Sequence, residues 1–241
     1  MQLSSAGGST SGRRWPVAQG LRFGLSDLDD ALAQLHALAR PAELAGMARF
    51  GLNVDRRLGA SIPSLRQLGR RLGRDHALAL VLWDTGIADA RILAALVAEP
   101  LRFDSRTMDN WARGFDSWDV CDQVCGNAFV RSPLAWRKVG AWAPRRAEFV
   151  RRAAFALLAQ LAVHDKAASD EPFIAALPLI EAAAGDERNF VRKAVNWALR
   201  QIGKRNAVLR AHAIACAERI RAQGTRPARW IAADALRELG P

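Results

Sequence analysis

The sequence predicts an all-α protein, and two observations support this fold class. The chain has 241 residues and no tyrosine, and it lacks the alternation of apolar and polar residues that is typical of strands. Apolar residues instead recur with a period near 3.6, as they do on one face of a helix. This period predicts helices, in chain order, at residues 25–39, 62–72, 77–83, 87–97, 118–129, 149–163, 173–184, 190–202, 208–220 and 228–239.

Prolines and small polar residues mark the expected helix boundaries. Proline disfavours a helix interior but fits the first turn, and an Asp or Ser side chain can accept a hydrogen bond from the free N–H groups at a helix start. The boundary prolines are Pro41, Pro63, Pro100, Pro133, Pro144, Pro172 and Pro227. The expected N-caps are Asp104, Asp116, Ser132 and Ser169.

An internal repeat predicts how these helices are arranged. Residues 149–161 align with residues 190–202 at an offset of 41, and Arg152 and Lys193 keep a positive charge at equivalent positions. The identical pairs are Phe149/Phe190, Val150/Val191, Arg151/Arg192, Ala153/Ala194, Leu158/Leu199 and Gln160/Gln201. A period of this length is typical of two-helix units of the HEAT type, which stack into a curved solenoid. We therefore expect a HEAT-like repeat solenoid in which Arg152 and Lys193 line one concave surface.

The positive charge of the chain lies almost entirely in its second half. The net charge is +11, but residues 1–130 carry 15 Lys and Arg against 14 Asp and Glu, whereas residues 131–241 carry 20 against 10. An Arg-rich and Ala-rich composition from a GC-rich genome explains part of the excess, but not this asymmetry. A basic second half indicates a polyanionic partner, because cations that neutralise phosphates release counterions.

Two segments place aromatic and charged residues on defined helix faces. Trp118 and Asp122 are four residues apart and therefore share one face of a helix. Lys193, Trp197, Arg200 and Lys204 form a second stripe that alternates cations with a ring. A tryptophan at helical spacing is more often a core residue, and an isolated aspartate is more often solvated. The combination of these residue types favours a DNA-binding surface.

At these residues the chain resembles the alkylpurine DNA glycosylases of the HEAT-like-repeat superfamily, the AlkD-like DNA alkylation repair enzymes. The resemblance covers about residues 44–239 and runs through segments 47–50, 117–122, 150–154 and 190–200. It implies a catalytic aspartate at Asp122, tryptophans at Trp118 and Trp197 beside the lesion, and an arginine at Arg152. The sequence differs from better-known members at Ser117, where they have a second aromatic residue before the first tryptophan.

The resemblance implies hydrolysis of the N-glycosidic bond of cationic N3- and N7-alkylated purines in duplex DNA, without a metal or another cofactor. Asp122 would stabilise the positive charge that develops on the sugar. Arg152 would keep Asp122 ionised and grip a phosphate. Lys193, Arg200 and Lys204 would hold the DNA backbone without reading its sequence. No obligate protein partner is implied, and we expect a monomer.

Two other classes of function stay open from the sequence. The same basic concavity could belong to a non-catalytic HEAT-repeat protein that binds damaged or branched DNA, or to a solenoid scaffold for an acidic protein. Only the glycosylase needs Asp122 for catalysis.

The remaining features predict the organisation and location of the protein. The Ser- and Gly-rich residues 1–20 suggest a flexible tail, and residues 21–241 a single domain. The apolar runs are too short to span a membrane, so we expect a soluble protein of the bacterial cytosol that is nucleoid-associated when bound to DNA. Cys121, Cys125 and Cys216 have no metal-ligand spacing, and we expect Cys121 and Cys125 to pack between helices. Packing or a place at a repeat junction is expected of Trp83, Trp111, Trp136, Trp142 and Trp230.

Overall fold

The computed structural model describes residues 24–240, and this part of the chain is helical, with no strand. The all-α prediction is therefore confirmed, while the predicted tail at residues 1–20 lies outside the described residues. The α-helices are α1 (Gly24–His36), α2 (Leu44–Arg49), α3 (Ile62–Leu72), α4 (His76–Asp84), α5 (Ala88–Val97), α6 (Ser105–Arg113), α7 (Trp118–Asn127), α8 (Ala135–Trp142), α9 (Glu148–His164), α10 (Glu171–Ala183), α11 (Asn189–Gly203), α12 (Ala207–Ala222) and α13 (Arg226–Leu239). Three single 3₁₀ turns are η1 (Pro41–Glu43), η2 (Pro100–Arg102) and η3 (Phe129–Arg131).

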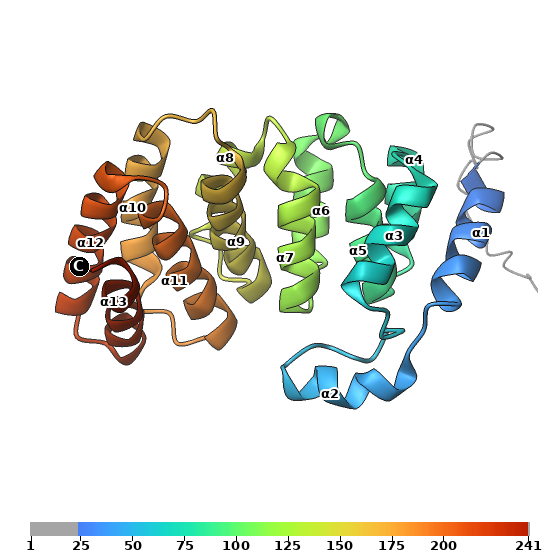
Figure 1. Cartoon of the computed structure of the whole chain (residues 1–241), viewed down its shortest axis with the longest axis horizontal. Coiled ribbons are helices and arrows are strands. Elements are labelled where there is room, and N and C mark those ends of the chain that lie inside the picture. Colours follow the sequence, from blue (N-terminus) through green and yellow to red (C-terminus); the bar gives the residue numbers. More distant parts are fainter. Residues whose placement is uncertain (1–23, 241) are drawn as a thin grey trace, which may run out of the picture.

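The helices stack side by side into an elongated solenoid (Figure 1). One layer is continuous, because α3, α5, α7, α9, α11 and α13 each contact the next helix in this series. We call it the inner layer. Helices α4, α8 and α12 each pack on an inner-layer helix and contribute to the second layer, together with α6 and α10. The two-helix repeat arrangement predicted from the 41-residue offset is thus the architecture of the molecule.

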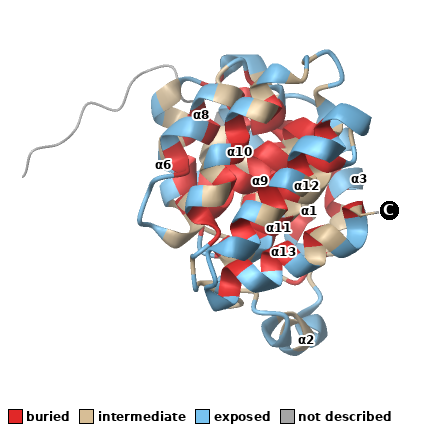
Figure 2. Ribbon diagram, turned by 90° about the vertical axis from the view of Figure 1, so that its left-hand side faces the viewer, coloured by how far each residue is buried: buried red, intermediate tan, exposed pale blue. Residues whose placement is uncertain are grey.

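The core lies between the two layers, where Figure 2 shows the buried residues gathered. Its largest fully buried side chains include Phe129, Phe155 and Phe173. Trp83 and Trp111 stack with ring centroids 4.4 Å apart, and both are buried, as is Trp142. The predicted packing role is confirmed for these three tryptophans. The three cysteines are buried as well.

The other two tryptophans of this group are less enclosed. Trp136 is half-buried and packs edge-on against Phe173. Trp230 is 38% exposed, and the guanidinium of Arg192 lies 4.7 Å from its ring centroid. Trp230 therefore covers the end of the solenoid instead of filling its interior.

The sequence pattern missed three short helices, α2, α6 and α8, and three of the four expected N-caps do not occupy the N-cap position. Asp104 caps α6 as expected, since its side chain accepts a hydrogen bond from the Thr107 N–H. Helix α7 instead begins after Ser117, and Asp116 accepts a hydrogen bond from Asn53. Ser132 lies three residues before the start of α8, and Ser169 lies two residues before the start of α10. A polar residue near a helix start is thus used in several ways.

Residues 41–57 leave the solenoid and return to it, and we call this segment the arm. Its ends meet where the Arg40 N–H donates a 2.8 Å hydrogen bond to the Leu58 carbonyl. Gly59 follows with a φ of 81°, and a Cβ there would lie 2.5 Å from the Arg40 carbonyl oxygen, so this crossing requires glycine. The arm carries α2, which has no buried residue and projects beyond the two layers in Figures 1 and 2.

The core packing predicts that Phe155→Ala is strongly destabilising. Phe155 is 0% exposed, and removing a ring from a packed interior costs about 3–5 kcal/mol. Urea unfolding should show this loss as a lower transition midpoint. The matched control is Leu101→Ala, because Leu101 is 79% exposed and surface changes stay within about 0.5 kcal/mol. Equal losses in the two variants would contradict this packing.

Candidate functional site

Asp122 and Arg152 form a buried, two-pronged ion pair between neighbouring helices of the inner layer. From α9, the Nε of Arg152 donates to Oδ1 of Asp122 at 3.1 Å, and Nη2 donates to Oδ2 at 2.7 Å. Asp122 lies in the middle of α7. Such a pair uses both carboxylate oxygens as acceptors and fixes the plane of the carboxylate. The structure brings these two residues together as the sequence comparison implied.

The same guanidinium also reaches a third helix. Nη1 of Arg152 donates a 2.6 Å hydrogen bond to the carbonyl of Phe190 in the first turn of α11. Arg152 is only 5% exposed, so its donors are directed into the protein. These contacts engage Nε, Nη1 and Nη2 of Arg152 and hold the Asp122 carboxylate in place. The predicted phosphate grip by Arg152 stays a prediction.

Two opposing effects act on the pKa of Asp122. Burial raises the pKa above the ordinary range, and the charge and hydrogen bonds of Arg152 offset part of this rise. The neighbouring carboxylate of Asp119 adds a smaller upward contribution. Because both oxygens accept hydrogen bonds from Arg152, the observed arrangement is that of the ionised carboxylate. Asp122 is thus held as an anion in a site that otherwise disfavours charge.

Trp118 and Trp197 line a cavity of about 670 Å³ that also contains Asp122. Trp118 begins α7, and its Nε1 donates a 3.1 Å hydrogen bond to the Phe50 carbonyl. Trp197 lies on α11, and both rings are half-buried. The cavity is mostly apolar, and its polar lining includes Gln123 and Gln160. An anionic carboxylate between two electron-rich rings is a suitable environment for a cationic, planar ligand.

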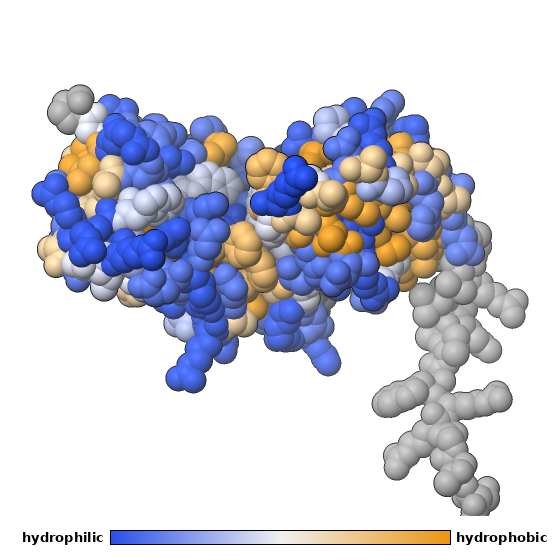
Figure 3. Space-filling view, turned by 90° about the horizontal axis from the view of Figure 1, so that it is seen from below, coloured by the Kyte–Doolittle hydropathy of each residue, from blue (hydrophilic) through white to orange (hydrophobic). Residues whose placement is uncertain are grey.

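The arm forms the other wall of this cavity through Met47, Phe50 and Leu52. Figure 3 views the molecule from the side on which the arm projects. Hydrophobic surface gathers mainly over the N-terminal half of that face, and hydrophilic surface prevails over the C-terminal half. Phe50 is 77% exposed although it is a large aromatic residue. The arm therefore gives an apolar rim to one side of the site.

The predicted cations divide into two groups. Lys193 is exposed and lines a smaller hollow of about 240 Å³ beside Phe50, Trp118 and Arg152, so the structure places it at the site.

Arg200 and Lys204 lie elsewhere. Arg200 forms ion pairs with Asp234 at 2.9 Å and with Glu238 at 2.6 Å, and Lys204 also pairs with Glu238. Carboxylates of α13 thus pair with both residues, and Asp234 is shared with Arg237. The structure does not bring Arg200 or Lys204 to the cavity.

Sequence reasoning missed a second ion pair at the site. Arg57 donates from Nη1 to Oδ2 of Asp119 at 2.7 Å and from Nη2 to Oδ1 at 2.9 Å. Both residues are 9% exposed, and Ser117 donates a further hydrogen bond to Asp119. From the sequence, Asp119 is a residue of the first turn of a helix, where the helix dipole favours a carboxylate. Its spacing of three residues from Asp122 was the available signal, since it places both carboxylates on adjacent positions of one helix face.

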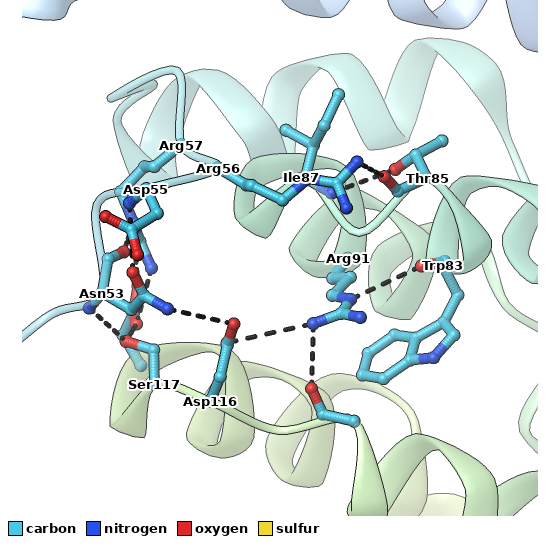
Figure 4. Close-up of polar contacts among 12 residues, drawn as sticks. Asn53, Asp55, Arg56, Arg57, Trp83, Thr85, Ile87, Arg91, Asp116 and Ser117 are labelled. Carbon is cyan, nitrogen blue, oxygen red and sulfur yellow. Dashed lines mark hydrogen bonds and ion pairs between the residues drawn. The ribbon is translucent and has the colours of Figure 1, made fainter.

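This pair is part of a network that fixes the loop after α2, shown in Figure 4. The Asn53 side chain donates to Asp116 at 3.2 Å, and Arg57 Nε donates to the Asn53 carbonyl at 3.0 Å. Arg56 donates to the Thr85 carbonyl at 2.7 Å. Farther along, the Asp89 carboxylate accepts hydrogen bonds from two backbone N–H groups, those of Leu58 and Ala60. The arm is thereby anchored to α5, α7 and the turn after α4.

Two further findings concern residues 24–240. No three His, Cys, Asp or Glu side chains in this range come together in a way that could hold a metal ion. None of the helices there is long and apolar enough to cross a membrane.

The stacked helix pairs and the inner-layer site define a protein of the HEAT-like repeat class. A solved structure is similar over 88% of this chain and 96% of its own, with a TM-score of 0.72 and 18% sequence identity. That protein is described as one of a new family related to the HEAT-like repeat DNA glycosylases, with affinity for branched DNA structures. The family model for the DNA alkylation repair enzymes matches residues 31–239. The chain belongs to this family. No curated protein matches it.

The Arg57–Asp119 pair predicts a large stability loss for Arg57→Met. The substitution leaves a buried carboxylate without its partner, which costs about 3–5 kcal/mol. Chemical unfolding should show this as a lower midpoint. The control is Arg221→Met, because the Arg221–Glu218 pair is exposed and such pairs contribute less than about 1 kcal/mol. A loss for Arg57→Met as small as that of the control would contradict the role assigned to this pair.

Proposed function

We propose that the protein is a monofunctional DNA glycosylase that hydrolyses the N-glycosidic bond of cationic N3- and N7-alkylated purines in duplex DNA and leaves an abasic site. The observation that carries this proposal is the ionised Asp122 at an open, aromatic-lined cavity, fixed by Arg152. Membership of the DNA alkylation repair family supports it.

The chemistry requires little from the protein besides a well-placed negative charge. Alkylation at N3 or N7 gives the purine a formal positive charge, which makes it a good leaving group. As the bond to the sugar breaks, positive charge develops on the sugar, and a nearby carboxylate stabilises it. Asp122 is the catalytic residue in this proposal, and Arg152 is a positioning residue that fixes the carboxylate plane. The purine leaves as the neutral free base, taking the bonding electron pair, and water adds to the sugar carbon and releases one proton to solvent.

The two tryptophans supply selectivity for charged lesions in this proposal. A cation over an aromatic face gains about 0.5–2 kcal/mol, and Trp118 and Trp197 both border the cavity. An unmodified purine carries no charge and gains no such contribution. Lys193, which is exposed beside Trp118, would contact the DNA backbone next to the lesion.

A second candidate function is recognition of branched or damaged DNA without catalysis. The structural neighbour with affinity for branched DNA favours this alternative. Both functions use the same surface, but only the glycosylase depends on the charge of Asp122. The two are therefore separated by one substitution that keeps the size of the side chain.

Asp122→Asn should reduce excision by about 10²–10³-fold while leaving DNA affinity largely unchanged. This is the effect of removing one preorganised electrostatic contact from a transition state. The measurement is release of free 7-methylguanine and 3-methyladenine from methylated duplex DNA under single-turnover conditions, with binding followed by fluorescence anisotropy. If the wild type binds tightly and releases neither base, the non-catalytic alternative replaces the proposal.

The rise in the pKa of Asp122 predicts an acid limb in the rate of excision. The ionised form is the active one, so the rate falls as pH decreases through the pKa. Because burial raises this pKa, the midpoint should lie above the ordinary aspartate value of about 3.9. A single-turnover pH profile, corrected for spontaneous depurination, measures it. The Asp122→Asn variant should lack this limb, and a limb of the same midpoint in that variant would assign it to another group.

A further inference from the structure

Arg200 and Lys204 form ion pairs with carboxylates of α13, whereas other cations of the described chain have no such partner. Helix α3 carries Arg66 and Arg70, which are exposed and have no hydrogen bond or ion pair to any other described residue through their side chains. The helix contains no acidic residue of its own. Both arginines, together with Arg74, line a hollow of about 250 Å³ whose lining contains no carboxylate. These are free positive charges in the half of the chain that is nearly neutral overall.

This hollow continues the site along the same helix faces. Helices α3, α5 and α7 each have a residue in the cavity that contains Asp122 and, four positions later, a residue in the hollow. The pairs are Ile62 and Arg66, Ile92 and Leu96, and Gln123 and Asn127. Four residues of helix advance about 6 Å, and the three helices lie next to one another in Figure 1. The arginine-lined hollow is therefore about one helical turn from the cavity.

The spacing of the arginines favours an anionic ligand. Arg66 and Arg70 are like charges at i and i+4, an arrangement that disfavours an isolated helix. Arg70 lies in the last turn, where the helix dipole favours a cation, but Arg66 lies in the middle of the helix and has no such compensation. Arg74 donates to the Ala98 carbonyl at 2.6 Å. A Cβ at Gly73, which also lines the hollow, would have no atom within 4 Å, so this part of the surface is open to a bulky group.

We propose that Arg66 and Arg70 bind the backbone phosphates of the DNA strand as it leaves the lesion site. The proposal rests on DNA being the ligand of the cavity, as in the proposed function. Arginine is suited to this role, since its planar guanidinium can donate two parallel hydrogen bonds to a phosphate. The contact would give affinity without sequence preference. It assigns the path of the DNA to the C-terminal half of α3, where the cations are free.

The test compares the salt dependence of DNA binding in two matched double variants. Each phosphate contact contributes about 0.9 to the slope of log affinity against log salt concentration. On a fluorescein-labelled duplex that carries one 7-methylguanine, Arg66→Ala/Arg70→Ala should therefore reduce the magnitude of this negative slope by about 1.8. Arg200→Ala/Lys204→Ala removes the same number of charges and should change the slope far less. Thermal unfolding verifies that both variants are folded.

The rate of excision separates this inference from the proposed function. With enzyme below saturation, Arg66→Ala/Arg70→Ala should lower the excision rate in proportion to its loss of DNA affinity, because the arginines hold DNA and do not touch the reacting atoms. An unchanged slope in this variant, or an equal change in the two variants, would overturn the phosphate-binding role. If the wild type excises no base but its DNA binding still depends on Arg66 and Arg70 in this way, the glycosylase is refuted and the phosphate-binding role of the two arginines stands.

Discussion

The site depends on one guanidinium. Arg152 links α7, where it pairs with Asp122, to the first turn of α11, where it donates to the Phe190 carbonyl. A solenoid is held together by contacts between neighbouring repeats, and most of these contacts are apolar and not directional. The Arg152 hydrogen bonds add direction, because they set the orientation of three consecutive inner-layer helices around the carboxylate. Trp118 and Trp197 lie on two of these helices, so the guanidinium that pairs with Asp122 also fixes the positions of the two aromatic walls.

Helix α7 has a second directional contact at its beginning. Arg57 binds Asp119 one turn before Asp122, and this pair holds the arm just as Arg152 holds the later repeats. The carboxylates of α7 are therefore the meeting point of the N-terminal arm and the C-terminal repeats. Buried ion pairs are often no more stabilising than apolar packing of equal volume. Their value here is specificity of position, since each one places a wall of the cavity.

Much of the fold was predictable, because the apolar period and the 41-residue repeat are direct consequences of stacking helices. The prediction failed at three short helices, of which α6 and α8 bury residues at helical spacing but extend over only 9 and 8 residues. Helix α2 has no buried residue and leaves no pattern. For the site, Asp122, Trp118 and Arg152 were identified through resemblance and lie together. Arg57 could not be found, since its partner Asp119 is 62 residues away. The charges of Arg200 and Lys204 were misjudged because the sequence does not show that α13 places two carboxylates against them.

The hydrogen bond that joins the two ends of the arm affects which sequence changes the protein can tolerate. The chain departs at Arg40 and returns at Leu58, and these two residues are hydrogen-bonded to each other. The intervening segment can therefore lengthen, shorten or alter its apolar residues without shifting the register of any solenoid helix. Because it forms one wall of the cavity, such changes would reshape the space beside Asp122 while that carboxylate stays in place. In the proposed glycosylase, this architecture would separate the segment that borders the ligand from the carboxylate that acts on it, and an exchange of the arm between relatives would transfer ligand preference as a unit.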